Sequence, residues 1–302
     1  MVVLTDNRNN ESAKLQERGD FAMIINHNLM ALTAYNNLAA NYSKMMLAME
    51  RLSSGLRINR AADDPAGLAI SEKMRAQIRG LEMAEKNAYD TISLLQTAEG
   101  ALHESHAIVH RIRELAVQAA NDTNTLEDRQ MMQMEINELL DELDMISGRT
   151  EFNTQKLLDG SFTERKFQIG ANSDQNITIS IGAMGSSALG LAGLRADPEG
   201  TSGGILTQEG ANDAIGLLDD AINAISKQRA RLGATQNRLE HTINNLSVTR
   251  ENLTAAESRI RDADLAKEMM NYTKYYILTQ AAQAILAQAN QIPMGVLQLL
   301  RM

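Results

Sequence analysis

Apolar residues recur along 31–56 at steps that alternate between four and three, which is a heptad pattern. The positions concerned are Ala31, Tyr35, Leu38, Tyr42, Met45, Met49, Leu52 and Leu56. This spacing predicts an amphipathic helix that packs lengthwise against another helix. Neither acidic residues nor Lys or Arg occur in 21-FAMIINHNLMALTAYNNLAANYS-43. Since a helix without charge on any side is usually buried, we expect it to contact more than one neighbour.

A charged turn, 57-RINRAADDPAG-67, ends this helix and begins the next one. Asp63 or Asp64 can cap a helix whose first residue is Pro65, where proline is tolerated. The predicted helix spans 66–120, and its apolar residues lie seven apart at Met74, Leu81, Ala88, Leu95, Leu102, Val109 and Ala116. At 1.5 Å per residue it would be a rod of roughly 80 Å, which fits a bundle or a coiled coil.

The predicted secondary structure changes between 126 and 206, from long helices to one shorter helix and a β-hairpin region. A shorter helix is predicted over 126–147, with Thr125 and Asp128 as a capping box and Gly148 as its C-cap. Residues 150–206 are predicted as a small β-hairpin region, because Phe167 and Ile169 alternate with polar residues, as do Ile177, Ile179 and Ile181. The Gly-, Ser- and Ala-rich segment 182–206 is predicted to be loop.

Helical periodicity returns over 207–255 and again over 260–292. The last helix repeats the four-and-three spacing of the first, with Leu278, Ala282, Ile285, Ala289 and Ile292. The uncharged segment 275–300 contains Gln, Asn and Pro293, so we expect no stable membrane insertion. The predicted fold class is mainly α: long antiparallel helices in a bundle or coiled coil with a small β-hairpin region, the N- and C-termini paired.

The composition of the chain disfavours some binding partners and excludes some kinds of site. The chain has 302 residues, a net charge of −9, 3% aromatic residues and no cysteine. An acidic chain is a poor partner for nucleic acid, and the lack of cysteine excludes disulfides and thiolate metal sites.

Three histidines, His103, His106 and His110, would lie on one helix face and form a weak candidate zinc or nickel site. Spacing fixes no further ligand, and 103-HESH-106 departs from the H-E-x-x-H pattern of metalloproteases. We therefore expect no metal, no cofactor and no enzymatic activity.

Several long blocks resemble the bacterial flagellin family. They are 24-IINHNLMALTAYNNL-38, 50-ERLSSGLRINRAADDPAGLAIS-71, 148-GRTEFNTQKLLDGSF-162 and 255-AAESRIRDADLAKEMMNYTKYYILTQAAQAILAQANQIPMGVLQLLR-301. The resemblance implies an inner helical domain with a connecting spoke formed by 23–65 and 258–302, and a second-shell domain formed by 66–257. Residues 1–22 are expected to be a disordered leader or a mis-assigned start, since family members begin at a Met that corresponds to Met23.

The resemblance also implies a secreted, extracellular structural subunit that self-assembles into the flagellar filament for motility. It would be exported unfolded by the flagellar type III apparatus, held by an export chaperone at its C-terminal helix, and would meet the filament cap and hook-junction proteins. The residues expected to pack in the filament core are Leu38, Tyr42, Met45, Met49, Leu52, Leu278, Ala282, Ile285, Ala289 and Ile292. Three alternatives are a hook–filament junction protein of the same superfamily, a membrane-active translocator, and an enzyme built on the histidines.

A further implication concerns innate immune recognition. The stretches 109-VHRIRELAVQAAN-121 and 133-QMEINELL-140 resemble those that Toll-like receptor 5 contacts in the family. The matching residues are Arg111, Glu114, Leu115 and Glu135. The competing interpretation is that these residues only form packing surface between subunits.

Overall fold

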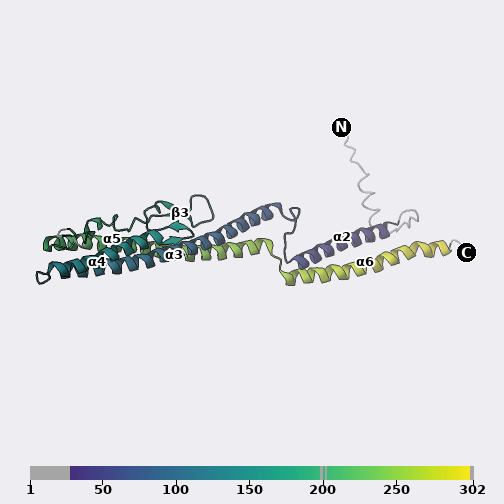
Figure 1. Cartoon of the computed structure of the whole chain (residues 1–302). Coiled ribbons are helices and arrows are strands. Elements are labelled where there is room, and N and C mark those ends of the chain that lie inside the picture. The colour runs from purple at the N-terminus through teal and green to yellow at the C-terminus, as the bar shows by residue number, and fades with distance from the viewer. Residues whose placement is uncertain (1–27, 198–199, 201–202, 300–302) are drawn as a thin grey trace, which may run out of the picture. The chain divides into compact units, whose positions relative to one another are not determined.

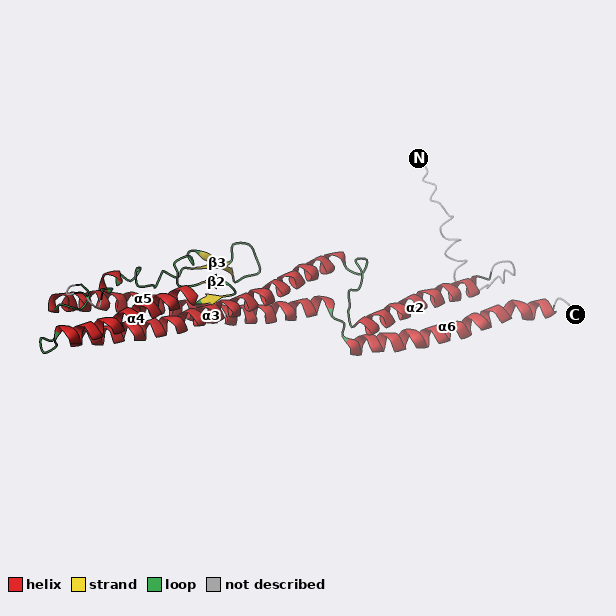
Figure 2. Cartoon of the chain, in the orientation of Figure 1, coloured by secondary structure: helices red, strands yellow, loops and turns green. Residues whose placement is uncertain are grey.

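The computed structural model describes residues 28–197, 200 and 203–299, and side chains as far as 295. The predicted leader 1–22 lies outside the described residues. The mainly helical prediction is confirmed, with long helices and two small antiparallel hairpins (Figures 1 and 2). The chain divides into two compact units. The first combines the described residues up to Ala69 with those from Arg259 on, and the second is Ile70–Ser258.

The first unit is an antiparallel pair of helices, α2 (Leu29–Ser54) and α6 (Leu265–Leu299). At one end Asn28 Nδ2 donates to the carbonyl of Ala289 over 2.8 Å, while its Oδ1 caps α2 by accepting from Ala31 N. At the other end Arg57 N donates to the carbonyl of Arg261 over 2.7 Å. Segments more than 200 residues apart in sequence therefore lie side by side, and the predicted pairing of the two chain ends is confirmed.

The turn between the first two helices uses its two aspartates differently. Asp64 Oδ1 accepts from Gly67 N over 2.9 Å, so Asp64 caps α3 (Pro65–Ala119) with Pro65 in the first turn. Asp63 Oδ2 accepts instead from the backbone N–H groups of Asn59 and Arg60, over 3.0 and 2.9 Å. Two adjacent carboxylates thus hold the helix start and the preceding turn.

The second unit packs α3 against α5 (Gln208–Arg261) and α4 (Leu126–Arg149). Four ion pairs tie α3 to α5 in antiparallel register: Arg75–Glu257, Glu85–Arg250, Glu99–Arg229 and Arg113–Asp219. The predicted stripe of α3 lies in the core, since Leu95, Leu102, Val109 and Ala116 are at most 1% exposed. The capping box of α4 is confirmed at Thr125 and Asp128.

The end of α4 differs from the prediction. Gly148 lies inside α4, and Thr150 is the C-cap. The chain then turns through a hairpin of β1 (Glu151–Phe152) and β2 (Gln155–Lys156), which the sequence pattern did not indicate. Its two turn residues, Asn153 and Thr154, both have left-handed backbones, as a type I′ turn requires. The usual Asn-Gly signal was missing because Thr stands in the second place.

The predicted β-hairpin is confirmed as β3 (Arg165–Gln168) paired with β4 (Asn176–Ile179), with Phe167 opposite Ile177. The segment after it is largely irregular, apart from a 3₁₀ turn, η1 (Ala192–Leu194), but it is packed into the core rather than free. Buried Gln133 of α4 explains part of this packing. Its Nε2 donates to the carbonyl of Leu194 over 2.8 Å, and its Oε1 accepts from Ile205 N over 2.9 Å.

Candidate assembly surface and receptor-contact cluster

The contact line between α2 and α6, here called the α2/α6 seam, combines small residues with larger ones. On α2 the least exposed positions follow heptad steps: Ala31, Ala34, Leu38, Asn41, Met45, Ala48 and Leu52. On α6 they are Tyr272, Tyr275, Thr279, Ala282, Leu286 and Ala289. Ala34, Ala48, Ala282 and Ala289 are each no more than 7% exposed. Small side chains at such positions allow two helix backbones to approach closely.

Every second position of the predicted apolar stripe on α2 lies one residue away from the seam. Tyr35, Tyr42 and Met49 are 58%, 55% and 41% exposed, while their neighbours Ala34, Asn41 and Ala48 lie in the seam. The same displacement occurs on α6, where Leu278, Ile285 and Ile292 are exposed. Adjacent residues on a helix are about 100° apart, so both choices continue an apolar stripe, and the small residue is the one that faces the partner.

The ten residues expected in the filament core consequently form two groups. The seam group, which contacts the partner helix of the same chain, is Leu38, Met45, Leu52, Ala282 and Ala289. The outward group, which is exposed outside the seam, is Tyr42, Met49, Leu278, Ile285 and Ile292. The structure brings the first group together and leaves the second on the surface.

The outward group belongs to a larger exposed apolar surface. Other large apolar side chains of this unit with at least 37% exposure are Leu29, Met30, Leu32, Tyr35, Met46, Leu47, Leu265, Met269, Met270, Tyr276, Ile277 and Met294. A shallow groove crosses both helices and is lined by Leu29, Met30, Ala34, Ile285, Ala289 and Ile292, among others. A concentration of exposed large apolar side chains on one helix pair marks a candidate interaction site.

Polar contacts fix the register of the helix pair near the turn. Arg51 Nη1 lies 3.4 Å from Glu268 Oε1, and the two side chains are 25% and 10% exposed. Asn271 Nδ2 also donates to Glu268. About two helical turns away, the ammonium of Lys44 lies 5.7 Å from the ring centre of Tyr275. A shift along the helices would break these contacts and leave the Glu268 carboxylate buried without its cation.

Three of the four residues expected to contact the immune receptor form one exposed cluster on α3 and α4. Arg111 Nε donates to Glu135 Oε1 over 2.9 Å, and Arg111 Nη1 donates to Glu114 Oε2 over 3.2 Å. These hydrogen bonds, the one to Glu135 first, raise the pKa of Arg111. Leu115 is different, because it is only 3% exposed and belongs to the core of the second unit. Its side chain supports the helix beneath the cluster.

The histidines do not form the metal site that their spacing suggested. The His106 and His110 rings meet edge to face with centres 4.4 Å apart. Burial lowers the pKa of His106, and the neighbouring charges of His110, Arg229 and His103 lower it further. Across the part of the chain that the structure describes, no three His, Cys, Asp or Glu side chains are grouped so as to hold a metal ion.

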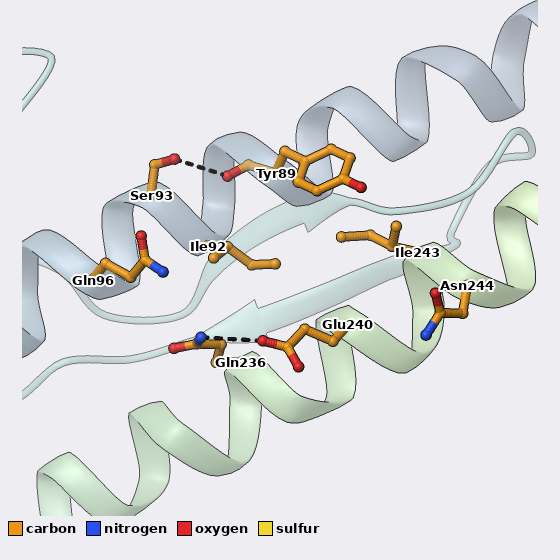
Figure 3. Close-up of a pocket in the computed structure, with 8 residues that line it drawn as sticks. All are labelled: Tyr89, Ile92, Ser93, Gln96, Gln236, Glu240, Ile243 and Asn244. Carbon is orange, nitrogen blue, oxygen red and sulfur yellow. Dashed lines mark hydrogen bonds between the residues drawn. The ribbon is translucent and has the colours of Figure 1, made fainter.

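A groove between α3 and α5 shows no arrangement for catalysis either (Figure 3). It is lined by Tyr89, Ile92, Ser93, Gln96, Gln236, Glu240, Ile243 and Asn244. Ser93 Oγ donates to the backbone carbonyl of Tyr89, and the Glu240 carboxylate accepts from Gln236 Nε2. The groove therefore has a serine and a carboxylate but no histidine or lysine to activate a nucleophile. Of the helices described, none is both long and apolar enough to cross a membrane.

Comparison with known proteins places the chain in a family. Profiles of the bacterial flagellin N-terminal and C-terminal helical regions match residues 25–163 and 215–300. Flagellin of Bacillus subtilis is 55% identical over 92% of this chain and its own full length, and flagellin of Halalkalibacterium halodurans is 54% identical with the same coverage.

Among solved structures, a chain described as a flagellar hook-associated protein of Vibrio parahaemolyticus has a TM-score of 0.57. It covers 66% of this chain and 100% of its own length, but at 14% identity it shows a shared fold alone. The two flagellin profiles and the two full-length relatives decide the family. The chain belongs to the bacterial flagellins and is a structural, non-enzymatic subunit of the extracellular flagellar filament.

Proposed function

We propose that this subunit polymerises through the outward faces of α2 and α6, which then form the innermost layer of the filament. The single observation that carries this proposal is the partition of apolar side chains on the helix pair. Alanines occupy four of the most buried positions of the α2/α6 seam, while Tyr42, Met49, Ile285 and their exposed neighbours remain outside it. Burying that surface between copies supplies about 25 cal/mol per Å² before the costs of association are subtracted.

The arrangement suits an open-ended polymer rather than a closed oligomer. Apolar side chains are exposed on both helices and along their length, from Leu29 and Met294 at one end to Leu265 at the other. A subunit with several different contact faces can join neighbours head to tail, and contacts that do not close into a ring produce helical filaments. The second unit, which has its own core, would form the next shell outward.

The first experiment compares Ile285→Asp with Ile285→Val in seeded elongation of heat-dissociated subunits, followed by electron microscopy. Ile285 is 58% exposed and outside the seam, so either variant should keep the wild-type helix content by circular dichroism. We expect Ile285→Asp to lower the elongation rate at least about tenfold, because a buried unpaired carboxylate is costly. Ile285→Val should elongate normally. Normal filaments from Ile285→Asp would contradict the proposal.

The same surface supports the proposed partners of the subunit before and at assembly. We propose that the subunit travels unfolded through the flagellar type III apparatus, and that an export chaperone covers the apolar face of α6 beforehand. The filament cap and the hook-junction proteins would contact the same helices at the two ends of the filament. This proposal is supported by the exposed apolar surface of the helices. Such a surface promotes aggregation unless another protein binds it before the neighbouring subunits do.

We also propose that Arg111, Glu114 and Glu135 contact Toll-like receptor 5 when the subunit is free. The three side chains are exposed and held in one orientation by the Arg111 hydrogen bonds, so they present a preformed charged cluster. A preformed cluster loses little conformational entropy on binding. Leu115 is omitted from the contact set because it is buried.

Arg111→Ala tests this proposal in a cell line that reports receptor signalling, with monomeric protein as the ligand. We expect the half-maximal concentration to rise at least about tenfold, because arginine is enriched among the interface residues whose truncation costs about 2 kcal/mol or more. Arg113→Ala is the matched control, since Arg113 pairs with Asp219 on α5 instead. Exposed ion pairs contribute little to stability, so both variants should unfold like the wild type. Equal signalling by the two variants would refute the contact.

A further inference from the structure

Methionine is concentrated on the exposed surface of the α2/α6 pair. The chain has 17 methionines, and the described part of the first unit holds seven of them. Met45 is half-buried, and six are exposed by 41–67%: Met30, Met46, Met49, Met269, Met270 and Met294. The thioethers of these six residues are therefore open to solvent in the free subunit.

Four of the six lie in the same part of the pair. The Arg51–Glu268 ion pair sets the two helices in register there. Met49 precedes Arg51 by two residues, and Met269 and Met270 directly follow Glu268. Met46 and Met49 also line a surface groove with Ser43, Leu47, Glu50, Ser53 and Arg60. Small solutes can reach these sulfur atoms.

At the opposite end of the pair, Met30 and Met294 are 58% and 65% exposed, and Met30 lines the groove that crosses both helices. Oxidation converts a methionine thioether into a polar sulfoxide, which disrupts Met-rich contact surfaces and which methionine sulfoxide reductases reverse. The Leu and Ile side chains beside these methionines have no comparable reaction with peroxide.

We propose that these six methionines are a reversible oxidation site that controls whether a free subunit can join the filament. The oxidant is a hydroperoxide such as H₂O₂. Its terminal oxygen is transferred to the sulfur as the O–O bond breaks, so the thioether loses two electrons and the peroxide is reduced to water. The inference rests on the proposed assembly surface, because the sulfoxides act only if that surface becomes buried between subunits.

The physical reason is the cost of burying the sulfoxide. Its oxygen is a strong acceptor, and a polar group that enters an apolar interface without a hydrogen-bond donor weakens association about tenfold or more. Several sulfoxides on one subunit would multiply this loss. The same methionines in a finished filament would be protected from oxidant by their neighbours.

The test treats dissociated subunits and intact filaments with the same dose of H₂O₂ and maps sulfoxides by peptide mass spectrometry. Met83 and Met131 of the second unit, 55% and 59% exposed, are internal references for reagent access. In subunits we expect all six methionines to oxidise at rates comparable to these references. In filaments we expect the six to be at least about fivefold protected relative to their rate in subunits.

Seeded elongation of the oxidised subunits then tests the consequence. We expect the rate to fall at least about tenfold and to recover after treatment with methionine sulfoxide reductases. A variant with leucine at all six positions should elongate after oxidation, while the control variant Met83→Leu/Met131→Leu should lose elongation as the wild type does. Since recovery by reductase is measured on the wild-type chain, a folding defect in the leucine variant would not obscure the result.

The outcomes separate the two proposals. If the six methionines oxidise equally fast in filaments and subunits, the α2/α6 surface is not buried and the proposed assembly surface fails. If they are protected in filaments but oxidised subunits still elongate at the untreated rate, the assembly surface stands and the oxidation site is refuted.

Discussion

At the scale of single residues, position in the local structure decides what a side chain does. Asp63 and Asp64 are adjacent, yet one closes the turn before α3 and the other caps the helix itself. Arg111 and Leu115 lie one helical turn apart on α3, yet the first is exposed and charge-paired while the second is buried. Residue type alone would not have separated these roles.

Asp63 gives the turn a pH dependence. Hydrogen bonds from the backbone of Arg60 and then Asn59 lower the pKa of Asp63 below its ordinary value of 3.8. A lowered folded-state pKa stabilises the fold above the unfolded-state value, and this stabilisation is lost as the pH falls through the folded-state pKa. Asp63→Asn should therefore destabilise the first unit near pH 7, and the difference from wild type should vanish in strong acid.

Urea unfolding followed by tyrosine fluorescence measures this effect, because five of the six tyrosines belong to the first unit and the chain has no tryptophan. Asp90→Asn on the exposed surface of α3 is the control for the change from Asp to Asn, and it should unfold as the wild type near pH 7. A difference between Asp63→Asn and wild type that persists unchanged at pH values well below 3.8 would contradict the role given to the Asp63 carboxylate.

At the scale of elements, α2 and α6 both carry apolar residues on several faces. The α2/α6 seam shows which face of each helix contacts the other. At adjacent positions of α2, the pair puts Ala34 in the seam and leaves Tyr35 outside, and it puts Ala48 in the seam and leaves Met49 outside. Larger side chains at these alanine positions would hold the backbones apart. The outer faces then keep the large apolar surface that an assembling subunit requires.

Ala34→Leu is the prediction that belongs to this scale. Ala34 is 7% exposed in the seam, so three added carbon atoms would overpack it and destabilise the pair by about 1–3 kcal/mol. Ala39→Leu makes the same change on an exposed face of α2 and should be nearly neutral in the isolated subunit. The measurement is the urea concentration at the unfolding midpoint of each variant. Equal midpoints would show that the small size of Ala34 does not determine how closely the two helices pack.

At the scale of the whole molecule, stability depends mainly on the second unit, and the proposed assembly depends on the first unit. The main core cluster lies between Ala88 and Ile243, entirely within the second unit. Apart from Ile58, the apolar side chains that the first unit buries fully are alanines, so neighbouring subunits would supply most of its apolar burial. A subunit built this way can stay folded in one part while the other part awaits assembly.

A chain reduced to residues 70–258 tests this division. We expect it to unfold cooperatively, to retain helical circular dichroism and to remain monomeric in analytical ultracentrifugation, because its core is self-contained and the α2/α6 surface is gone. Seeds that elongate the intact chain should not elongate it. A truncated chain without a cooperative transition would show that the second unit needs the first for its stability.

The sequence by itself determined the helices, the capped turn and the β3/β4 hairpin of this protein, because these depend on local spacing and on short-range capping. The helical period of the apolar residues correctly predicted that Leu95 and Leu102 lie on the buried face of α3. The Asp-Asp-Pro turn predicted where α3 begins. Long motifs that resemble the flagellin family also indicated its role.

Only the tertiary structure decided which of two adjacent stripe positions faces the partner helix, Ala34 or Tyr35. It also decided that Leu115 is buried beneath the Arg111 cluster and that Gln133 ties down the segment around Leu194. These outcomes depend on the volumes and hydrogen-bond partners that a distant segment brings. The hydrophobic period of one helix defines a broad apolar face, but how closely its partner can approach selects the residues on that face that meet.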